Sequence, residues 1–278
     1  MNDVQKCILS IFKEVVKVCD NNNISYYAIG GTCIGAIRHK GFIPWDDDLD
    51  IAIPIEQYVF FLECAKKELP VGYCVKMPSD TQHYQSLWAK VCDNRTTFIE
   101  ESEYNYPDSY KGVFVDIMPI SGVPNSKITR SLFCSWLFFL DRSNHILRFC
   151  CSSNEKKRKI KYFPYFILTH LVSFHFFSDL FDKELRRHPF YESQMTGYVW
   201  YTCWLKRLVF PTNWFGEGVI IQFEDTTIKC PSEYKRYLQF QFGEYMTPPP
   251  IGERQTHSGI VDLQTPFGKY ARNGIFKQ

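Results

Sequence analysis

The sequence lacks several patterns that would assign it to a familiar class of protein at once. Its 11 cysteines include no C-x-x-C pair, and their odd number does not suit a complete disulfide framework. No window reaches the run of about 18 apolar residues that a membrane-spanning helix needs. The N-terminus has no basic start followed by an apolar stretch, as a signal peptide would. We therefore expect a cytoplasmic protein with free, mostly buried thiols.

A strong excess of charge of one sign is also missing. The chain carries 32 Lys and Arg against 30 Asp and Glu, a net charge of +2. A general nucleic-acid binder would show a large basic excess, so no nucleic-acid partner is expected. With 278 residues, 45% of them hydrophobic, the chain is long enough for one sizeable core and a smaller lobe.

Helical and strand patterns alternate up to about residue 120. Residues 3–20 and 55–69 have apolar side chains at helical spacing, and short apolar runs between turn residues predict strands. One such strand is expected over 111–118 and should end before Pro119. The alternation favours an α+β (α/β) fold with a mixed sheet and flanking helices.

Gly30, Gly31 and Thr32 lie between an expected strand at 26–29 and an expected helix at 32–38. Two glycines let the chain turn sharply and let a ligand approach the main chain closely. The N-terminus of the helix offers free N–H groups and the positive end of its dipole, which suit a phosphate. Gly-Gly before a helix is more often purely structural, so other residues must support this interpretation.

A run of carboxylates follows in Asp46-Asp47-Asp48-Leu49-Asp50. Alternate residues of a strand share a face, so Asp48 and Asp50 project together while Leu49 faces the core. Neighbouring carboxylates repel each other unless a cation lies between them, and oxygen ligands suit Mg²⁺ or Mn²⁺. For Asp46 and Asp47 a solvated acidic loop is an equally good interpretation.

A third carboxylate is expected from a neighbouring strand. Asp116 stands in the apolar run 112–118, where an unpaired charge would be costly. The simpler alternative is an Asp that caps a turn at the end of the strand. Gly-Gly before a helix, an Asp-x-Asp strand and a lone Asp in a later strand are together typical of the nucleotidyltransferase superfamily. In that pattern Asp48, Asp50 and Asp116 are the metal ligands and catalytic residues.

The segment from Gly30 to Ile51 resembles the signature of the LicD family, which comprises phosphocholine and related phospho-alcohol transferases and is similar to the fukutin-related proteins. The resemblance continues in Lys90-Val91-Cys92-Asp93, in 115–120 around Asp116, and in Phe242-Gly243-Glu244-Tyr245-Met246 before Arg254 and His257. It covers roughly residues 1–125 and 213–258. Two departures are mild: Phe242 stands where Tyr is usual, and Glu244 where Asp is usual.

The resemblance implies transfer of a phospho-alcohol from a CDP-alcohol to a sugar hydroxyl of a surface glycan or its lipid-linked precursor, with release of CMP. Mg²⁺ or Mn²⁺ on the three aspartates would neutralise the charge of the transferring phosphoryl group. Asp116 is the first choice for the general base, and Asp93 would orient Lys90 or contact a substrate. Substrate contacts are expected from Gly30, Gly31, Thr32, Arg38, Trp45, Asp47, Lys90, Asp93 and His257. The competing hypotheses are another nucleotidyltransferase-fold reaction, such as nucleotide addition, and a non-catalytic scaffold that docks on a membrane.

The middle of the chain has a different composition. Residues 126–190 carry 12 Lys and Arg against 5 Asp and Glu, together with many aromatic residues. We predict a nucleotidyltransferase-like core over 1–125, a mainly helical insertion over 126–212, and a C-terminal hairpin, helix and extended tail over 213–278. Two interpretations of the insertion stay open. It either makes peripheral contact with the inner face of a membrane, or forms a lobe over the sheet with Lys156–Lys159 as a solvated loop.

Overall fold

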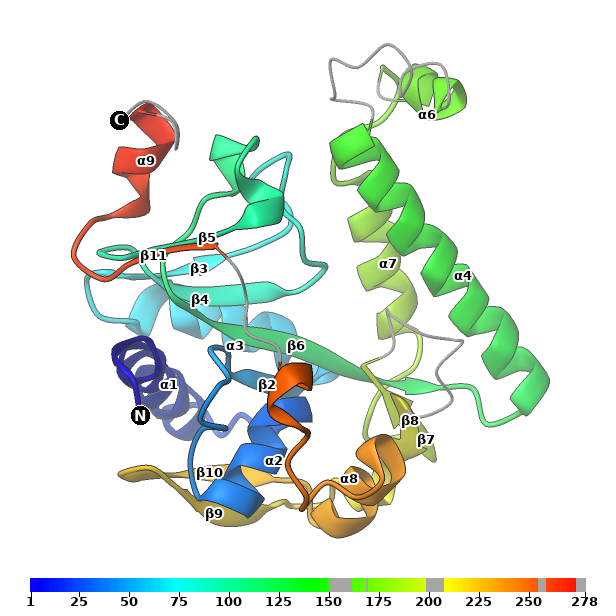
Figure 1. Ribbon diagram of the computed structural model, residues 1–278. Helices are drawn as coiled ribbons and strands as arrows, with labels where there is room; N and C mark the ends of the chain where they lie inside the picture. Colours follow the sequence, from blue (N-terminus) through cyan, green and yellow to red (C-terminus); the bar gives the residue numbers. More distant parts are fainter. Residues whose placement is uncertain (151–161, 169, 199–207, 255–258, 274–278) are drawn as a thin grey trace.

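A mixed sheet of seven strands lies at the centre of the computed structural model, which describes residues 1–150, 162–168, 170–198, 208–254 and 259–273 (Figure 1). Its order is β1-β2-β6-β4-β3, and β7 and β8 extend it beside the far end of β6. Among the described strands, β2 and β6 are parallel and the other neighbours antiparallel, which confirms the predicted mixed sheet. The strands are β1 Tyr27–Ala28, β2 Asp50–Pro54, β3 Tyr73–Lys76, β4 Ala89–Asp93, β6 Phe114–Val123, β7 Met195–Gly197 and β8 Val209–Pro211.

Three helices surround the central strands: α1 Asp3–Asn21, α2 Gly30–His39 and α3 Ile55–Glu68. Helices α1 and α3 contact each other and both contact β6, so they cover the same face of the sheet. Ile51, Val91 and Ile117 are fully buried beneath them. Because side chains alternate along a strand, residues 50, 90 and 116 point to the opposite face. The helices predicted at 3–20 and 55–69 are confirmed.

Strand β6 is longer than predicted, because it continues through Pro119 to Val123. The N–H of Asp116 donates to Leu49 O at 2.9 Å, so the nitrogen atoms of residues 117 and 119 point toward the other edge of the strand. On that edge the pairing with β4 ends at Ile117, and the pairing with β7 begins at Ser121. Pro119 therefore lies where the ladder requires no N–H donor.

Residues 126–212 are mainly helical where they are described, as predicted, and they also contribute β7 and β8. The helical elements are α4 Lys127–His145, a π-helical turn η3 Ile146–Cys150, α6 Phe163–Leu168 and α7 Phe176–Arg186. Helices α4 and α7 pack together along one edge of the molecule (Figure 1). Lys156–Lys159 lie outside the described residues. No helix in the described ranges is long and apolar enough to cross a membrane.

The C-terminal part contacts β1 and α2 of the core. Strands β9 Val219–Phe223 and β10 Thr226–Cys230 form the expected hairpin, and α8 spans Tyr234–Phe242. Strand β11 Gly259–Asp262 then pairs with β5 Thr97–Glu100, and α9 Phe267–Asn273 follows. The 3-10 turns are η1 Glu101–Glu103, η2 Pro107–Ser109, η5 Thr212–Trp214 and η6 Ile251–Glu253. The cysteines with described side chains are free thiols and mostly buried, as expected from the sequence.

Candidate active site

Three neighbouring strands place three charged side chains in one row. Asp50 of β2 lies opposite Asp116 of β6, and Asp116 lies opposite Lys90 of β4. The row forms part of the wall of a cavity of about 280 Å³ on the sheet face opposite α1 and α3. The other lining residues are Asp48, Gln85, Ser86, Trp88, Glu100, Phe114 and Met118. The structure thus brings together Asp48, Asp50, Lys90 and Asp116, which the sequence singled out separately.

Asp116 is held by two donors that bind the same carboxylate oxygen. Lys90 Nζ lies 2.6 Å from Asp116 Oδ1, and the Trp88 indole N–H also donates to Oδ1. The Lys90 ammonium lies 3.6 Å from the centre of the Phe114 ring, a close cation–π contact. Burial by itself lowers the pKa of Lys90, but the Asp116 carboxylate outweighs it, so the net pKa of Lys90 is raised. Lys90 is therefore a charged, fixed cation at the floor of the cavity.

Asp50 is anchored through its backbone by the Gly-Gly-Thr segment. Its N–H donates to Thr32 Oγ1 at 2.8 Å, so the Thr32 side chain joins the start of α2 to the start of β2. Burial raises the pKa of the Asp50 carboxyl well above its ordinary value, and the carboxylates of Asp48 and Asp116 raise it further. A cation placed among these carboxylates would remove that repulsion.

Helix α2 begins at Gly30 itself, two residues earlier than predicted. Gly30 has a φ of +55°, a left-handed conformation that favours glycine, and its N–H donates to the Tyr237 hydroxyl at 2.9 Å. A Cβ at Gly31 would lie 2.9 Å from Asp46 Oδ2, so a side chain there would force the Asp46 carboxylate to shift. The N–H groups of Gly31 and Thr32 lie in the first turn of the helix, where no intrahelical carbonyl accepts them.

The loop that carries the acidic run is fixed from α1. The amide of Gln5, a buried residue, donates to Ile43 O at 3.1 Å and to Asp46 O at 2.7 Å. Asp46 and Asp47 are half-buried, and Asp47 is not among the residues that line the cavity. Asp46 still acts on the site, because its charge is one cause of the raised pKa of Asp50. Both residues therefore belong to the supporting loop.

Two arginines lie around Trp45 and form a basic cluster outside the cavity. The guanidinium carbon of Arg254 lies 4.1 Å from the centre of the Trp45 ring, and that of Arg38 lies 6.0 Å from it. Arg38 donates to Tyr245 O at 2.6 Å, and Arg254 donates to Pro249 O at 3.2 Å, so the C-terminal tail completes the cluster. Burial and the nearby charge of Arg254 lower the pKa of Arg38. In the described ranges neither guanidinium forms an ion pair with a carboxylate, which suits an anionic ligand.

Asp93, another predicted site residue, does not line the cavity. Asp93 is three residues beyond Lys90 on β4 and so faces the opposite side of the sheet. There it accepts two hydrogen bonds of 2.8 Å from the Arg95 guanidinium. Asp116, not Asp93, orients Lys90. His257 lies outside the described residues.

Arg148 links the helical segment to the cavity wall. It is fully buried in the π-helical turn and donates to the carbonyl groups of Pro78, Thr81 and Gln82. The loop tied in this way leads directly to Gln85, Ser86 and Trp88 in the cavity wall. Burial lowers the pKa of Arg148 to about 10, which shows how far this guanidinium is withdrawn from water.

The described part of the cavity offers carboxylate oxygens to a metal ion but not a complete set of ligands. Among the described residues no three His, Cys, Asp or Glu side chains converge as a ready-made ligand set. Mg²⁺ usually takes only one or two protein carboxylates and completes its shell from phosphate and water. The mutually repelling carboxylates around Asp50 therefore fit such a cation once a phosphate ligand is present.

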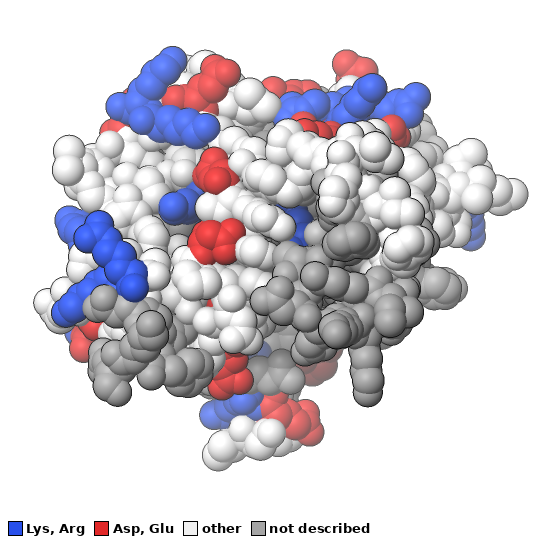
Figure 2. All heavy atoms as spheres, turned by 90° about the horizontal axis from the view of Figure 1, so that it is seen from above, with Lys and Arg blue, Asp and Glu red and all other residues white. Residues whose placement is uncertain are grey.

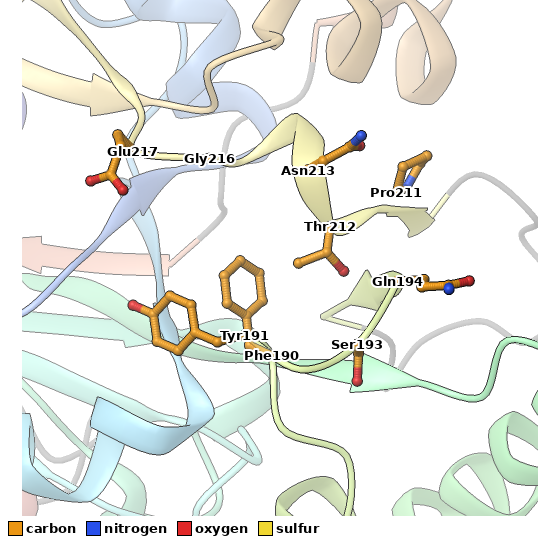
Figure 3. A pocket seen from close by; sticks show the side chains of 9 residues that line it. All are labelled: Phe190, Tyr191, Ser193, Gln194, Pro211, Thr212, Asn213, Gly216 and Glu217. Carbon is orange, nitrogen blue, oxygen red and sulfur yellow. The ribbon is translucent and has the colours of Figure 1, made fainter.

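A larger cavity of about 470 Å³ lies elsewhere in the fold and shares no lining residue with the first (Figure 3). Phe190 and Tyr191 lie on one side of it, and Thr212 and Asn213 on the other. Among the described residues that line it, only Glu217 is charged, so this cavity does not suit a phosphate. On the face seen in Figure 2, the described acidic and basic side chains are interspersed, without one broad patch of a single sign. The smaller, carboxylate-lined cavity is therefore the candidate active site.

Comparison with known proteins identifies the family of the chain. A family model described as LicD/FKTN/FKRP, nucleotidyltransferase domain, matches residues 23–176. A lipopolysaccharide cholinephosphotransferase LicD of Haemophilus influenzae is 30% identical over 267 residues, which cover 92% of this chain and 95% of that protein. This chain belongs to the LicD family. As a LicD-family member it is an enzyme, a transferase.

Two shorter matches are to uncharacterized proteins of Rickettsia. That of Rickettsia typhi is 38% identical over 69 residues, 25% of this chain and 22% of that protein. That of Rickettsia prowazekii is 37% identical over 68 residues, 24% of this chain and 26% of that protein. The LicD-family region at 23–176 contains β2, β4 and β6, the three strands that hold the row of Asp50, Asp116 and Lys90.

Several residues of the site carried no clear signal in the sequence. Gln5 occupies the buried side of an amphipathic helix, where a polar residue is unexpected and could have been noticed. Trp88 and Tyr237 are aromatic residues of a kind that is common in cores, and only their polar atoms matter here. Arg254 contacts the ring of Trp45 because the C-terminal tail brings it there, and the sequence does not specify the path of that tail.

Proposed function

We propose that this LicD-family enzyme transfers a phospho-alcohol from a CDP-alcohol to a sugar hydroxyl of a surface glycan or its lipid-linked precursor, releasing CMP. The row of Asp50, Asp116 and Lys90 in the wall of one cavity carries the proposal. Carboxylates beside a fixed cation suit a metal ion together with phosphate oxygens. Because the relative from Haemophilus influenzae is named for cholinephosphate transfer to lipopolysaccharide, phosphocholine and lipopolysaccharide are the first donor group and acceptor to test.

The proposed cofactor is Mg²⁺ or Mn²⁺, as one or two ions shared among Asp48, Asp50 and Asp116. When bound, such an ion neutralises negative charge on the transferring phosphoryl group and lowers the pKa of the acceptor hydroxyl. The repulsion that raises the pKa of Asp50 supports this assignment.

The remaining residues would bind and orient the donor. The N–H groups of Gly31 and Thr32 at the start of α2 suit its diphosphate. Arg38 and Arg254 supply positive charge at the other end of the same helix. A helix rises about 1.5 Å per residue, so Arg38 lies roughly 10 Å from Gly31 along the axis, within the length of an extended nucleotide donor.

For the transfer, the acceptor oxygen forms a bond to the phosphorus that carries the alcohol, and the bond from that phosphorus to the CMP oxygen breaks. Asp116 is the proposed acceptor of the hydroxyl proton. Lys90 and Trp88 both donate to Oδ1 and thereby fix the carboxylate, which leaves the proton to be taken by Oδ2. Lys90 thus acts as a positioning residue for Asp116.

The experiment is a measurement of CMP release from CDP-choline, CDP-glycerol and CDP-ribitol, with Mg²⁺, with Mn²⁺ and with a chelator. We expect metal-dependent release from one of these donors and a fall of at least about a hundredfold in Asp50→Asn. Asp20→Asn, a change of an exposed carboxylate on α1, is the matched control and should stay active. Full activity of Asp50→Asn would refute the proposed site. Incorporation of CMP from CTP without turnover of any CDP-alcohol would favour nucleotide addition.

A further inference from the structure

Large apolar side chains are exposed along one side of α4. Ile128, Leu132, Trp136 and Phe139 keep 75%, 67%, 39% and 46% of their surface accessible. Their spacing of four, four and three residues places them within about 80° of one another around the helix axis. We call this set the α4 ridge. It forms a continuous line along most of the helix.

The opposite side of α4 is buried against the rest of the protein. Phe133, Leu137 and Leu140 are buried, and the helix packs against α7. A helix that is apolar on both sides is normally buried all round. The ridge therefore has no function in the core, and an exposed apolar stripe of this length marks an interaction surface.

The ridge is an edge of the molecule, not a groove. Helix α4 runs along the side of the structure, with α6 beyond its C-terminal end (Figure 1). The rings of Trp136 and Phe139 stack with 5.4 Å between their centroids and form a flat aromatic surface within the ridge. Phe163 and Ile167 of α6 are exposed as well. A convex strip of this kind fits a soft, flat partner.

The charges beside the ridge are basic. Lys127 and Arg142 are exposed near the two ends of α4, and Ser131 and Ser135 flank its centre. The acidic residue of this helix, Asp141, points away from the ridge but pairs with Arg142 at 2.7 Å, so Lys127, Arg142 and Asp141 together leave one net positive charge beside the ridge. Apolar and aromatic side chains between basic ends are the pattern of a helix that lies in the interface of an anionic bilayer.

We propose that the α4 ridge docks the enzyme on an anionic lipid bilayer, with the helix lying in the plane of the interface. Leu132 and Trp136 enter the boundary between headgroups and acyl chains, and Lys127 and Arg142 lie at the level of the phosphates. The proposal does not depend on the transfer reaction. It goes beyond the proposed function because it gives the enzyme a fixed orientation on the membrane.

The test is cosedimentation of the full chain with vesicles of phosphatidylglycerol and phosphatidylethanolamine, compared with vesicles of phosphatidylcholine alone. We expect binding to the anionic vesicles and a loss of at least about tenfold in the partition coefficient for Leu132→Ser/Trp136→Ser. Val71→Ser/Ile220→Ser removes two other exposed apolar side chains and is the matched control. Circular dichroism establishes that both double variants are folded.

A second measurement identifies the residue that enters the bilayer. Brominated acyl chains should quench part of the tryptophan emission of the wild-type chain but less of that of Trp136→Phe, while Trp136→Phe still binds. Equal binding by the ridge variant and the control would overturn the proposal. So would a ridge-dependent dimer in light scattering without vesicle binding, because the occupant would then be a second copy of the chain. CMP release in detergent-free buffer with a soluble acceptor reports on the transfer reaction separately.

Discussion

The side-chain oxygen of Thr32 accepts a hydrogen bond of 2.8 Å from the backbone N–H of Asp50. Thr32 is buried and stands in the first turn of α2, whereas Asp50 opens β2. One bond thus fixes the spacing between the expected phosphate-binding turn and the carboxylates.

Thr32→Val should destabilise the protein. It removes the acceptor and leaves the N–H of Asp50 unpaired, at a cost of about 1–3 kcal/mol. Thr32→Ser keeps the oxygen and should lose much less. Urea unfolding of the three proteins measures the difference, and a Val variant as stable as the wild type would show that the bond is unimportant.

Asp50→Asn should alter the pH dependence of stability. The folded-state pKa of Asp50 is raised above its ordinary 3.8, so the folded protein holds this proton more tightly than the unfolded chain. The contribution of Asp50 to stability is therefore present below pH 3.8 and is lost as the pH rises toward its folded pKa. With a chelator at pH 7, Asp50→Asn should be at least as stable as the wild type although it is inactive.

Thermal unfolding between pH 4 and 8 checks this expectation, with Asp20→Asn as the control. Added Mg²⁺ should raise the melting temperature of the wild type and not that of Asp50→Asn. If the melting temperatures of Asp50→Asn and wild type changed in parallel across this pH range, Asp50 would not be the carboxyl group whose pKa is raised by folding.

Lys90→Met should lower the free energy of unfolding by more than an ordinary surface substitution does. It leaves the buried Asp116 carboxylate without its cation, and breaking a buried pair in this way costs about 3–5 kcal/mol. The double variant Lys90→Met/Asp116→Leu should recover much of that loss, since neither charge is then buried alone. A double-mutant cycle from denaturant unfolding gives the coupling energy, and additive losses would rule the pair out as a coupled unit.

Arg148→Lys should loosen the wall of the candidate active site. Lysine keeps the charge but cannot reach the three carbonyl groups at once, and each lost charge-assisted bond costs about 1.5–3 kcal/mol. Amide exchange should quicken in residues 78–88, and KM for the donor should rise. Arg142→Lys, at an exposed ion pair, is the control and should leave exchange in this loop unchanged.

Arg254→Gln should weaken donor binding. If Arg38 and Arg254 hold the anionic donor equally in the ground state and the transition state, KM should rise about tenfold while kcat changes little. Arg236→Gln, at an exposed arginine of α8, is the matched control. Steady-state kinetics of CMP release separate the two parameters, and an unchanged KM would remove Arg254 from the donor site.

Local patterns in the sequence were sufficient for the elements and for part of the site. The alternation of carboxylate and apolar residues around Asp50 and Asp116 predicted buried strands with charged side chains on one face, and the register confirms that they are neighbours. The period of two also shows that Asp93, which the sequence offered as a residue that orients Lys90 or contacts a substrate, does not share the face of Lys90. A separation of three residues turns it to the other face.

The remaining features depend on contacts between distant segments. The ion pair of Lys90 with Asp116 follows from the register of two antiparallel strands, which no local pattern specifies. Pro119 interrupts a strand pattern, and only the gap between β4 and β7 explains why β6 continues through it. Arg254 reaches Trp45 because the tail crosses the core, a path set by packing and not by sequence spacing.

Strand β7 returns to β6 with Met195 directly opposite Val123. The chain thus leaves the sheet after Val123 and re-enters it beside the same residue, so the excursion between them starts and finishes at one point. Arg148 lies within this excursion and holds the loop beside the cavity wall, so a change of length that spares Arg148 leaves both the wall and the strand of Asp116 in place. The helix that carries the α4 ridge is therefore joined to the strand of Asp116 at a single point of the sheet.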